Sequence, residues 1–257
     1  MSDALVGHTG FVGGNLIRQH EFVAHYNSKN IGEIRGRAFD TVVFSGAQAK
    51  KWWANQNPDA DLAGIESAIE NMRSVSARRV ILISTIDVLP QRAGVDEDFD
   101  CASVENHAYG NHRLRLEEAM TSMFDQVNIV RLPALFGPGL KKNVIFDLMN
   151  DNILETINPA SEFQYYDLTR LWRDIEFIVE NNLPLVHLFP APVATRQILD
   201  AFFPDKIVGM KAAPEAHYDY RTKYDELFGR NDGYIAGAET VLASLGAFLT
   251  AEQGRAE

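Results

Sequence analysis

The chain has 257 residues, of which 46% are hydrophobic and 23% charged, and its net charge is −11. These values are typical of a soluble globular protein, and so acidic a surface disfavours general nucleic-acid binding. Cys101 is the only cysteine, which excludes an intrachain disulfide and a cysteine metal cluster. We expect a cytoplasmic protein without membrane contact, because no apolar run approaches the roughly 20 residues of a membrane span and the N-terminus lacks a signal-peptide pattern.

Strand-like and helix-like segments alternate through the first half of the chain. We expect strands at residues 4–6, 21–26, 41–45, 79–84 and 127–132, and helices at 11–18, 62–74 and 108–124. The strand at 79–84 contains Val-Ile-Leu-Ile, a continuous apolar run typical of parallel strands buried on both faces. The alternation therefore predicts an α/β fold with a doubly wound parallel sheet.

Three glycines follow the first predicted strand at the spacing G-x-x-G-x-x-G, and a helical pattern follows them at once. The glycines are Gly7, Gly10 and Gly13. Glycines in such a turn let the backbone approach a pyrophosphate closely, and the free N–H groups of a helix start bind its negative charge. The motif predicts a dinucleotide site, although Gly-rich turns between a strand and a helix also occur without ligands.

The character of the sequence changes after Gly137-Pro138-Gly139, where short helices, loops and aromatic clusters follow. We expect a Rossmann-like dinucleotide-binding domain over residues 1–137 and a smaller substrate lobe over residues 138–257. No flexible linker separates the two parts. The lobe is therefore expected to return partly to the first domain.

Further motifs follow the glycine motif in a fixed order. They are Ser45-Gly46-Ala47, Ile83-Ser84-Thr85, Tyr109-Gly110-Asn111-His112-Arg113, and an R-x-x-x-x-x-G-P segment that begins at Arg131. In this order the motifs resemble the extended short-chain dehydrogenase/reductase superfamily, whose members include NAD(P)-dependent nucleotide-sugar epimerases, dehydratases and reductases. The resemblance covers nearly the whole chain and is informative about the superfamily more than about the substrate.

The resemblance implies that Tyr109 is the catalytic acid/base and that Thr85 hydrogen-bonds the substrate oxygen. Arg113 stands where the superfamily normally has lysine. Because residues i and i+4 share a helix face, the Arg113 charge is expected beside the Tyr109 phenol, where it lowers a pKa that is ordinarily about 10. The alternatives are a surface tyrosine on an amphipathic helix and, for Thr85, an ordinary hydroxyl at a strand end.

The end of the second predicted strand indicates the type of cofactor. NAD sites usually place Asp or Glu there to bind the ribose diol. This chain has an amide, a hydroxyl and a cation instead, so the sequence favours NADP, with NAD as the alternative. The residues expected to bind the cofactor are Gly7, Thr9, Gly10, Phe11, Val12, Gly13, Asn27, Ser28, Lys29, Ser45, Gly46, Ala47, Tyr109, Arg113, Leu132 and Pro133.

A basic pair follows the Gly-Pro-Gly turn, at Lys141 and Lys142, with Asn143 next to it. In an acidic protein a local basic pair can hold a substrate diphosphate, and a pair of solvated charges is the alternative. With Thr85, these three residues are the expected substrate-binding residues. The histidines form no metal-binding spacing, so no metal is expected.

The expected function is that of an NAD(P)-dependent oxidoreductase or epimerase acting on a carbonyl or alcohol of a sugar, with a nucleotide-linked sugar favoured. Dehydratases of the superfamily carry Asp-Glu after the threonine, whereas this chain has Ile86-Asp87. We therefore disfavour 4,6-dehydration and expect Asp87 in a solvated loop. Two alternatives stay open: a dinucleotide-binding sensor or scaffold that has lost catalysis, favoured by Arg113, and a reductase of a non-sugar carbonyl. The resemblance is compatible with a homodimer.

Overall fold

A computed structural model describes residues 2–90 and 93–256, and the chain divides into two compact units. The first unit comprises Met1–Pro90, Phe99–Leu132 and Arg170–His187, and the second comprises Gln91–Asp98, Pro133–Thr169 and Leu188–Glu257. Residues 170–187 lie beyond the boundary expected at residue 137 and belong to the first unit. Each unit is therefore assembled from segments that are distant in sequence.

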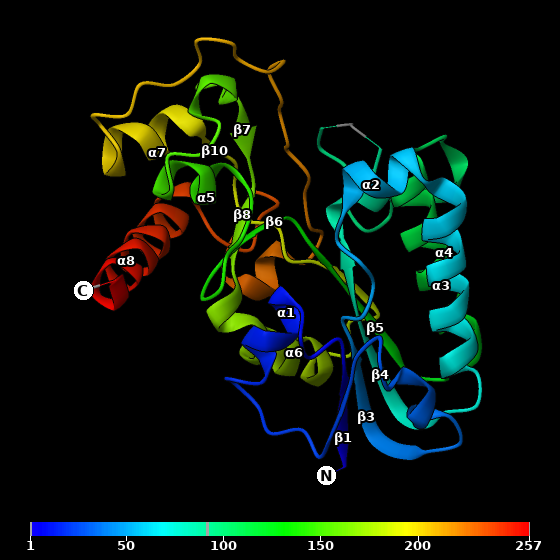
Figure 1. Ribbon diagram of the computed structural model, residues 1–257. Helices are drawn as coiled ribbons and strands as arrows, with labels where there is room; N and C mark the ends of the chain where they lie inside the picture. Colours follow the sequence, from blue (N-terminus) through cyan, green and yellow to red (C-terminus); the bar gives the residue numbers. More distant parts are fainter. Residues whose placement is uncertain (1, 91–92, 257) are drawn as a thin grey trace. The chain divides into compact units, whose positions relative to one another are not determined.

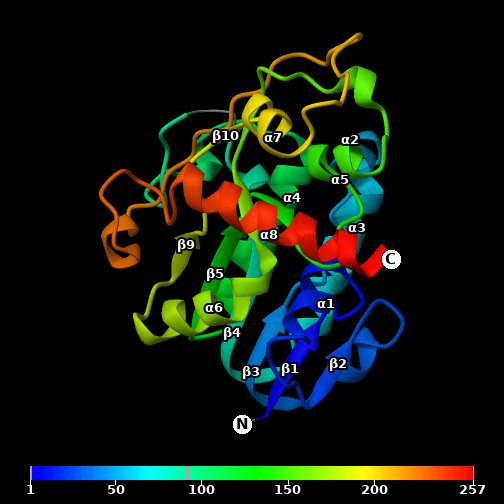
Figure 2. The same cartoon turned by 90° about the vertical axis from the view of Figure 1, so that its left-hand side faces the viewer.

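The first unit contains a six-stranded sheet in the order β2-β1-β3-β4-β5-β9, in which every neighbouring pair is parallel. This confirms the doubly wound parallel sheet predicted from the sequence. In Figure 2, β2 is seen at one edge of the sheet. The strands are β1 (Asp3–Val6), β2 (Ala24–Tyr26), β3 (Ala38–Phe44), β4 (Ser76–Thr85), β5 (Val127–Leu132) and β9 (Leu185–His187).

Helices cover both faces of this sheet, with α3 and α4 on one face and α1 and α6 on the other (Figure 1). The face beneath α3 and α4 holds a core of buried aliphatic and aromatic side chains, among them Val42, Ile69 and Leu116. The helices of the first unit are α1 (Phe11–Leu16), α2 (Lys51–Gln56), α3 (Pro58–Met72), α4 (Ala108–Met123) and α6 (Leu171–Glu180).

The order of the strands reverses between β1 and β3. The chain passes from β1 through α1 to β2 on one side, and then returns through a short 3-10 turn (Ile31–Ile34) to β3 on the other side of β1. Ligands of open α/β sheets bind outside the carboxyl ends of the strands at such a switch point. The register pairs Val6 with Phe44, so the loops that follow β1 and β3 leave the sheet together.

The second unit has two small sheets, one of parallel β6 and β8 and one of antiparallel β7 and β10. A core of its own, including Phe136, Tyr165 and Leu245, joins these strands to the helices. Figure 2 shows α8 as one long uninterrupted helix. The elements are β6 (Ala134–Phe136), α5 (Val144–Met149), β7 (Glu162–Phe163), β8 (Tyr165–Asp167), β10 (Val193–Ala194), α7 (Thr195–Phe202) and α8 (Ala238–Ala256).

Short 3-10 turns complete the secondary structure. Besides the turn after β2, they are Ile86–Val88, Cys101–Ser103, Leu154–Thr156, Leu168–Arg170 and Asp225–Phe228. Among residues 2–90 and 93–256, none of the helices combines the length and the apolar character needed to cross a membrane.

Candidate active site

The glycine turn after β1 is built so closely that two of its three glycines leave no room for a side chain. Gly7 has a φ of +93°, and a Cβ there would lie 2.5 Å from the Ser45 carbonyl oxygen. A Cβ on Gly13 would lie 2.2 Å from the Gly7 oxygen, so this glycine lets α1 pack on the turn. A Cβ on Gly10 would meet only the Gly7 oxygen, at 3.2 Å, so the turn is open on that side. An exposed backbone flanked by glycines fits the approach of a pyrophosphate.

The loops after β2 and β3 lie against the glycine turn, as the sequence predicts for a cofactor site. The Ser45 hydroxyl donates to the Val6 carbonyl at 2.9 Å. Asn27 Nδ2 lies 3.4 Å from His8 Nε2, and Asn27 Oδ1 accepts from the Lys29 N–H. Thr9, Ser28, Lys29 and Gly46 are exposed, and Phe11, Val12 and Ala47 are half-buried.

Tyr109 is placed by the tight start of α4. The His107 side chain caps the helix, since its Nδ1 accepts from the Gly110 N–H at 3.0 Å, and Asn55 Oδ1 accepts from the Tyr109 N–H. A Cβ on Gly110 would lie 2.2 Å from the Asp87 carbonyl oxygen. Glycine at this position therefore lets the first turn of α4 press against the loop after β4, and this contact sets the place of Tyr109.

Tyr109 and Thr85 come together as the sequence predicts. Thr85 is the last residue of β4, and its hydroxyl lowers the pKa of the Tyr109 phenol. Burial raises the pKa of Tyr109 to about 12, against the lowering effects of the Arg113 charge and the Thr85 hydroxyl. Asp87 and Asp61 raise it further. The Arg113 charge therefore lowers the pKa of Tyr109 as expected, but burial of the phenol outweighs it, and the net pKa is raised rather than lowered.

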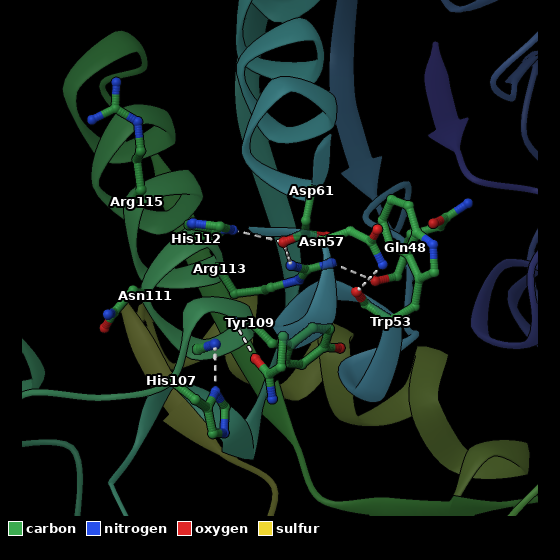
Figure 3. A network of polar contacts seen from close by, with 12 residues as sticks. Gln48, Trp53, Asn57, Asp61, His107, Tyr109, Asn111, His112, Arg113 and Arg115 are labelled. Atoms are coloured by element: carbon green, nitrogen blue, oxygen red, sulfur yellow. Dashed lines mark hydrogen bonds and ion pairs between the residues drawn. The ribbon is translucent and has the colours of Figure 1, made fainter. Parts of the chain in front are cut away.

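Arg113 is buried beneath the Tyr109 ring, with 3% of its surface exposed. Its guanidinium carbon lies 3.9 Å from the ring centroid. Nη1 donates to the carboxylate of Asp61, on α3, and Nη2 to the carbonyl oxygen of Gln48 (Figure 3). The cation thus faces the ring and is engaged by a buried carboxylate and a carbonyl.

Asp61 joins a second residue of α4 to this cluster. His112 Nδ1 lies 2.7 Å from Asp61 Oδ2, on the side away from the tyrosine (Figure 3). Burial raises the pKa of Asp61, but hydrogen bonds and charge from Arg113 and His112 outweigh burial, and the pKa is lowered overall. Asp61 is therefore a charged carboxylate at neutral pH that fixes both neighbouring side chains.

Asp87 does not lie in a solvated loop, and that expectation is wrong. Its carboxylate forms an ion pair with Lys51 of α2, with Oδ1 2.6 Å from Nζ, and its side chain is 19% exposed. Its Oδ2 lies 3.4 Å from Thr85 Oγ1, and its backbone N–H donates to the same oxygen at 3.1 Å. The turn after β4 therefore carries a charged pair next to the Thr85 hydroxyl.

The remaining predicted residues fall in two places. Leu132 is buried and pairs with Thr85 in the register of β4 and β5. Pro133 is buried and belongs to the second unit, as do the exposed residues Lys141 and Lys142. Asn143 caps α5: its Oδ1 accepts from the Phe146 N–H at 3.1 Å, and its Nδ2 donates to the Leu135 carbonyl at 2.8 Å.

The sequence alone did not reveal four contributors to the site. Three are Asp61, Lys51 and Gln48. The fourth is Gly110, which lets α4 pack closely against the Asp87 carbonyl. Asp61 lies in the first turn of α3 and is 52 positions from Arg113. No local pattern connects them, since an acid in a first helical turn ordinarily interacts with the helix dipole. One signal was available in the sequence. An arginine four residues after Tyr109, on a helix face expected to be buried, requires an anion nearby, because a buried cation needs a partner of opposite charge.

The chain matches no protein-family profile and no curated protein, but it is similar to many solved structures. An NAD-dependent NDP-hexosamine 5,6-dehydratase, TunA, is 14% identical with a TM-score of 0.77, over 98% of each chain. MoeE5 in complex with UDP-glucose and NAD is 12% identical with a TM-score of 0.74, over 100% of each chain. A dTDP-4-dehydrorhamnose reductase from Clostridium acetobutylicum is 15% identical with a TM-score of 0.73, over 98% of this chain and 100% of that one. Likeness at these identities establishes that the chain has the Rossmann-like α/β fold of these proteins.

Proposed function

We propose that the chain is a member of the extended short-chain dehydrogenase/reductase superfamily and works as an NAD(P)-dependent oxidoreductase or epimerase on a carbonyl or alcohol carbon of a nucleotide-linked sugar. One observation carries the proposal: the start of α4, which bears Tyr109, packs against the turn that follows Thr85 at the carboxyl end of β4, so that the Thr85 hydroxyl lowers the pKa of the phenol. Ligands of such sheets bind at this edge. The similar structures add support, because MoeE5 holds UDP-glucose with NAD.

The glycine turn fits a dinucleotide. Gly7 and Gly13 are required by the turn itself, whereas Gly10 presents bare backbone on its open side. A bound nicotinamide cofactor supplies hydride transfer chemistry. Asn27, Ser28 and Lys29 carry no carboxylate for a ribose diol, so we propose NADP as the preferred cofactor. Among the similar structures, one dTDP-4-dehydrorhamnose reductase is in complex with NADP, and MoeE5 is in complex with NAD.

The protein residues would act on the substrate oxygen. The raised pKa keeps the Tyr109 phenol protonated near neutral pH, so in reduction it gives its proton to the substrate oxygen. Thr85 orients that oxygen, and Arg113 supports the ring from its face. We propose that Lys141 and Lys142 contact the diphosphate of the substrate, whereas Asn143 serves the start of α5 with both ends of its side chain.

Binding and turnover measured together test the proposal. Calorimetry with NADPH and NADH is expected to show binding of both, with NADPH tighter. A panel of nucleotide-linked 4-keto sugars is then expected to be reduced, and Tyr109→Phe is expected to keep cofactor binding and lose turnover. Binding without turnover on any sugar or ketone would instead favour the sensor or scaffold. Turnover confined to non-sugar ketones would favour the other reductase.

A further inference from the structure

The side chain that caps α4 is a histidine, and its ability to cap the helix depends on its protonation state. His107 Nδ1 accepts from the Gly110 N–H, with 3.0 Å between the two nitrogens (Figure 3). Because a backbone N–H can only donate, Nδ1 carries no hydrogen of its own. A neutral imidazole has one N–H, which therefore lies at Nε2. The cap thus fixes both the charge of His107 and the position of its hydrogen.

The surroundings of the ring favour this neutral form. His107 Nε2 lies 3.9 Å from Asp87 Oδ1, and Lys51 Nζ of α2 lies 2.6 Å from the same carboxylate oxygen. The ring of Tyr109, on α4 itself, has its centroid 6.3 Å from that of His107, and Glu105, two residues before the histidine, is exposed. Burial and the charge of Lys51 lower the pKa of His107, against the raising effect of Asp87. The helix dipole also disfavours a positive charge at a helix N-terminus.

Protonation of His107 removes the cap. The second proton can enter the ring only at Nδ1, because Nε2 already carries a hydrogen, and the imidazolium has no acceptor left. The Gly110 N–H then loses its partner. Gly110 is buried, and a buried N–H without an acceptor is unfavourable. The protonated histidine and the closed first turn of α4 therefore exclude each other.

Tyr109 lies inside the turn that this cap closes. The hydrogen bond joins His107 to Gly110 and so spans the backbone of Tyr109. Two further contacts hold the same turn: Asn55 Oδ1 accepts from the Tyr109 N–H at 3.0 Å, and Asn106 Oδ1 accepts from the His107 N–H at 2.8 Å. Amide oxygens do not titrate, whereas histidine changes its charge between about pH 5 and 8. Of these three acceptors, the imidazole is therefore the one that responds to pH in this range.

We propose that His107 is a positioning residue that holds the backbone of Tyr109 in place only as the neutral imidazole with its hydrogen on Nε2, and that acid releases this hold. The inference rests on the proposed function only in treating Tyr109 as the proton-transfer group. The Tyr109 phenol, with a pKa of about 12, stays protonated throughout the acid range. A loss of turnover in acid therefore has to come from another group, and His107 supplies it by opening the turn.

Asparagine at position 107 separates the cap from its titration, because its side chain also caps helices but does not titrate. The pKa of His107 in the folded protein is lowered from 6.5, so its contribution to stability is complete above pH 6.5 and is lost as the pH falls through the folded value. In urea unfolding we expect the wild type to lose stability relative to His107→Asn between pH 8 and pH 5. His107→Ala, which has no cap, is expected to be less stable than His107→Asn at every pH. His25→Asn, the same change at an exposed histidine of β2, is the matched control and is expected to retain the acid loss.

Nitrogen NMR of the free protein with isotope-labelled histidine tests the tautomer directly, and His107→Asn assigns the signal. At pH 8 we expect Nδ1 without a hydrogen and Nε2 with one. As His107 takes up its proton, the Gly110 amide signal is expected to shift with the same midpoint. A hydrogen on Nδ1 at pH 8, a Gly110 amide that does not follow the titration, or an equal acid loss in the wild type and His107→Asn would overturn the inference.

These measurements need neither cofactor nor substrate, so the two proposals fail separately. A cap that is released in acid, in a protein without turnover, would retain this inference and reject the enzyme. In an active protein the acid limb of kcat is expected to move to lower pH in His107→Asn, with little change in the KM for the cofactor. Turnover whose acid limb stays in place in His107→Asn would retain the enzyme and reject this role of His107.

Discussion

Substitution of Arg113 tests how much the contacts of its guanidinium group contribute to the stability of the protein. The guanidinium joins Asp61 of α3, the Gln48 carbonyl and the Tyr109 ring, and it is 3% exposed. Arg113→Met keeps length and apolar packing but leaves the Asp61 carboxylate buried with His112 as the neighbour that still contacts it in this cluster. Removal of one partner from a buried ion pair lowers the free energy of unfolding by about 3–5 kcal/mol. We expect Arg113→Met to destabilise the protein within that range.

Arg113→Lys separates charge from geometry. A lysine ammonium can pair with Asp61, but it has no planar fork that also reaches the Gln48 carbonyl while lying flat on the Tyr109 ring. An unsatisfied buried polar group costs about 1–3 kcal/mol, so the loss is expected to be smaller than for methionine and clearly above zero. Lysine, the usual residue in the superfamily that the motifs resemble, is thus expected to destabilise this protein when it replaces Arg113.

Urea unfolding followed by circular dichroism measures these effects, and a double-mutant cycle with Asp61→Asn isolates the pair. We expect the double variant to lose less than the sum of the single losses, by about 0.5–3 kcal/mol. Additive losses, or a cost for Arg113→Met below about 1 kcal/mol, would refute the view that Asp61 and Arg113 act as one unit.

Three further outcomes are expected. Gly13→Ala places a Cβ 2.2 Å from a backbone oxygen and is expected to abolish dinucleotide binding in calorimetry, whereas Gly14→Ala, whose nearest contact would be 3.9 Å away, is tolerated. Glu117→Gln leaves the buried Arg131 guanidinium without its carboxylate. The variant is expected to lose about 3–5 kcal/mol of unfolding free energy in urea. A loss below about 1 kcal/mol would contradict a stabilising ion pair. Because the pKa of Asp61 is lowered from 3.8, its contribution is complete above that pH and lost below it. The stability difference between wild type and Asp61→Asn should therefore shrink as the pH falls below 3.8, and a constant difference would be inconsistent with the pairing.

The sheet was predictable because its strands are short apolar runs with turn or loop residues on both sides. The strand at 127–132 agrees with β5, and the helix expected at 108–124 ends one residue earlier, at Met123. The strand expected at 41–45 begins at Ala38 in the structure, since its first residues pair with Ser76 and Ala77 of β4. Pairing of that kind depends on the neighbouring strand and leaves little trace in local composition.

The element that local reasoning missed is also the one that carries Lys51. Helix α2 spans only Lys51–Gln56, and of its residues Ala54 alone is buried. So short a segment shows no hydrophobic period, and the adjacent tryptophans gave no strand or helix signal. Its docking beside α4 is fixed in part by the Asn55 side chain, which accepts from the Tyr109 N–H. The sequence therefore showed the tyrosine and the threonine but gave no sign that Lys51 lies close to them.

The position i+4 from the tyrosine shows how far a local rule extends. The helical period correctly placed Arg113 beside Tyr109, but the period does not decide whether a charge faces the ring or the oxygen. That choice is made by Asp61, since a buried guanidinium turns toward the carboxylate that compensates it. From beneath the ring the Arg113 charge still lowers the pKa of Tyr109, but burial outweighs it and raises the pKa to about 12. The local rule therefore predicted the neighbour and the direction of its effect. The net pKa is decided by burial, which depends on elements that are distant in the sequence.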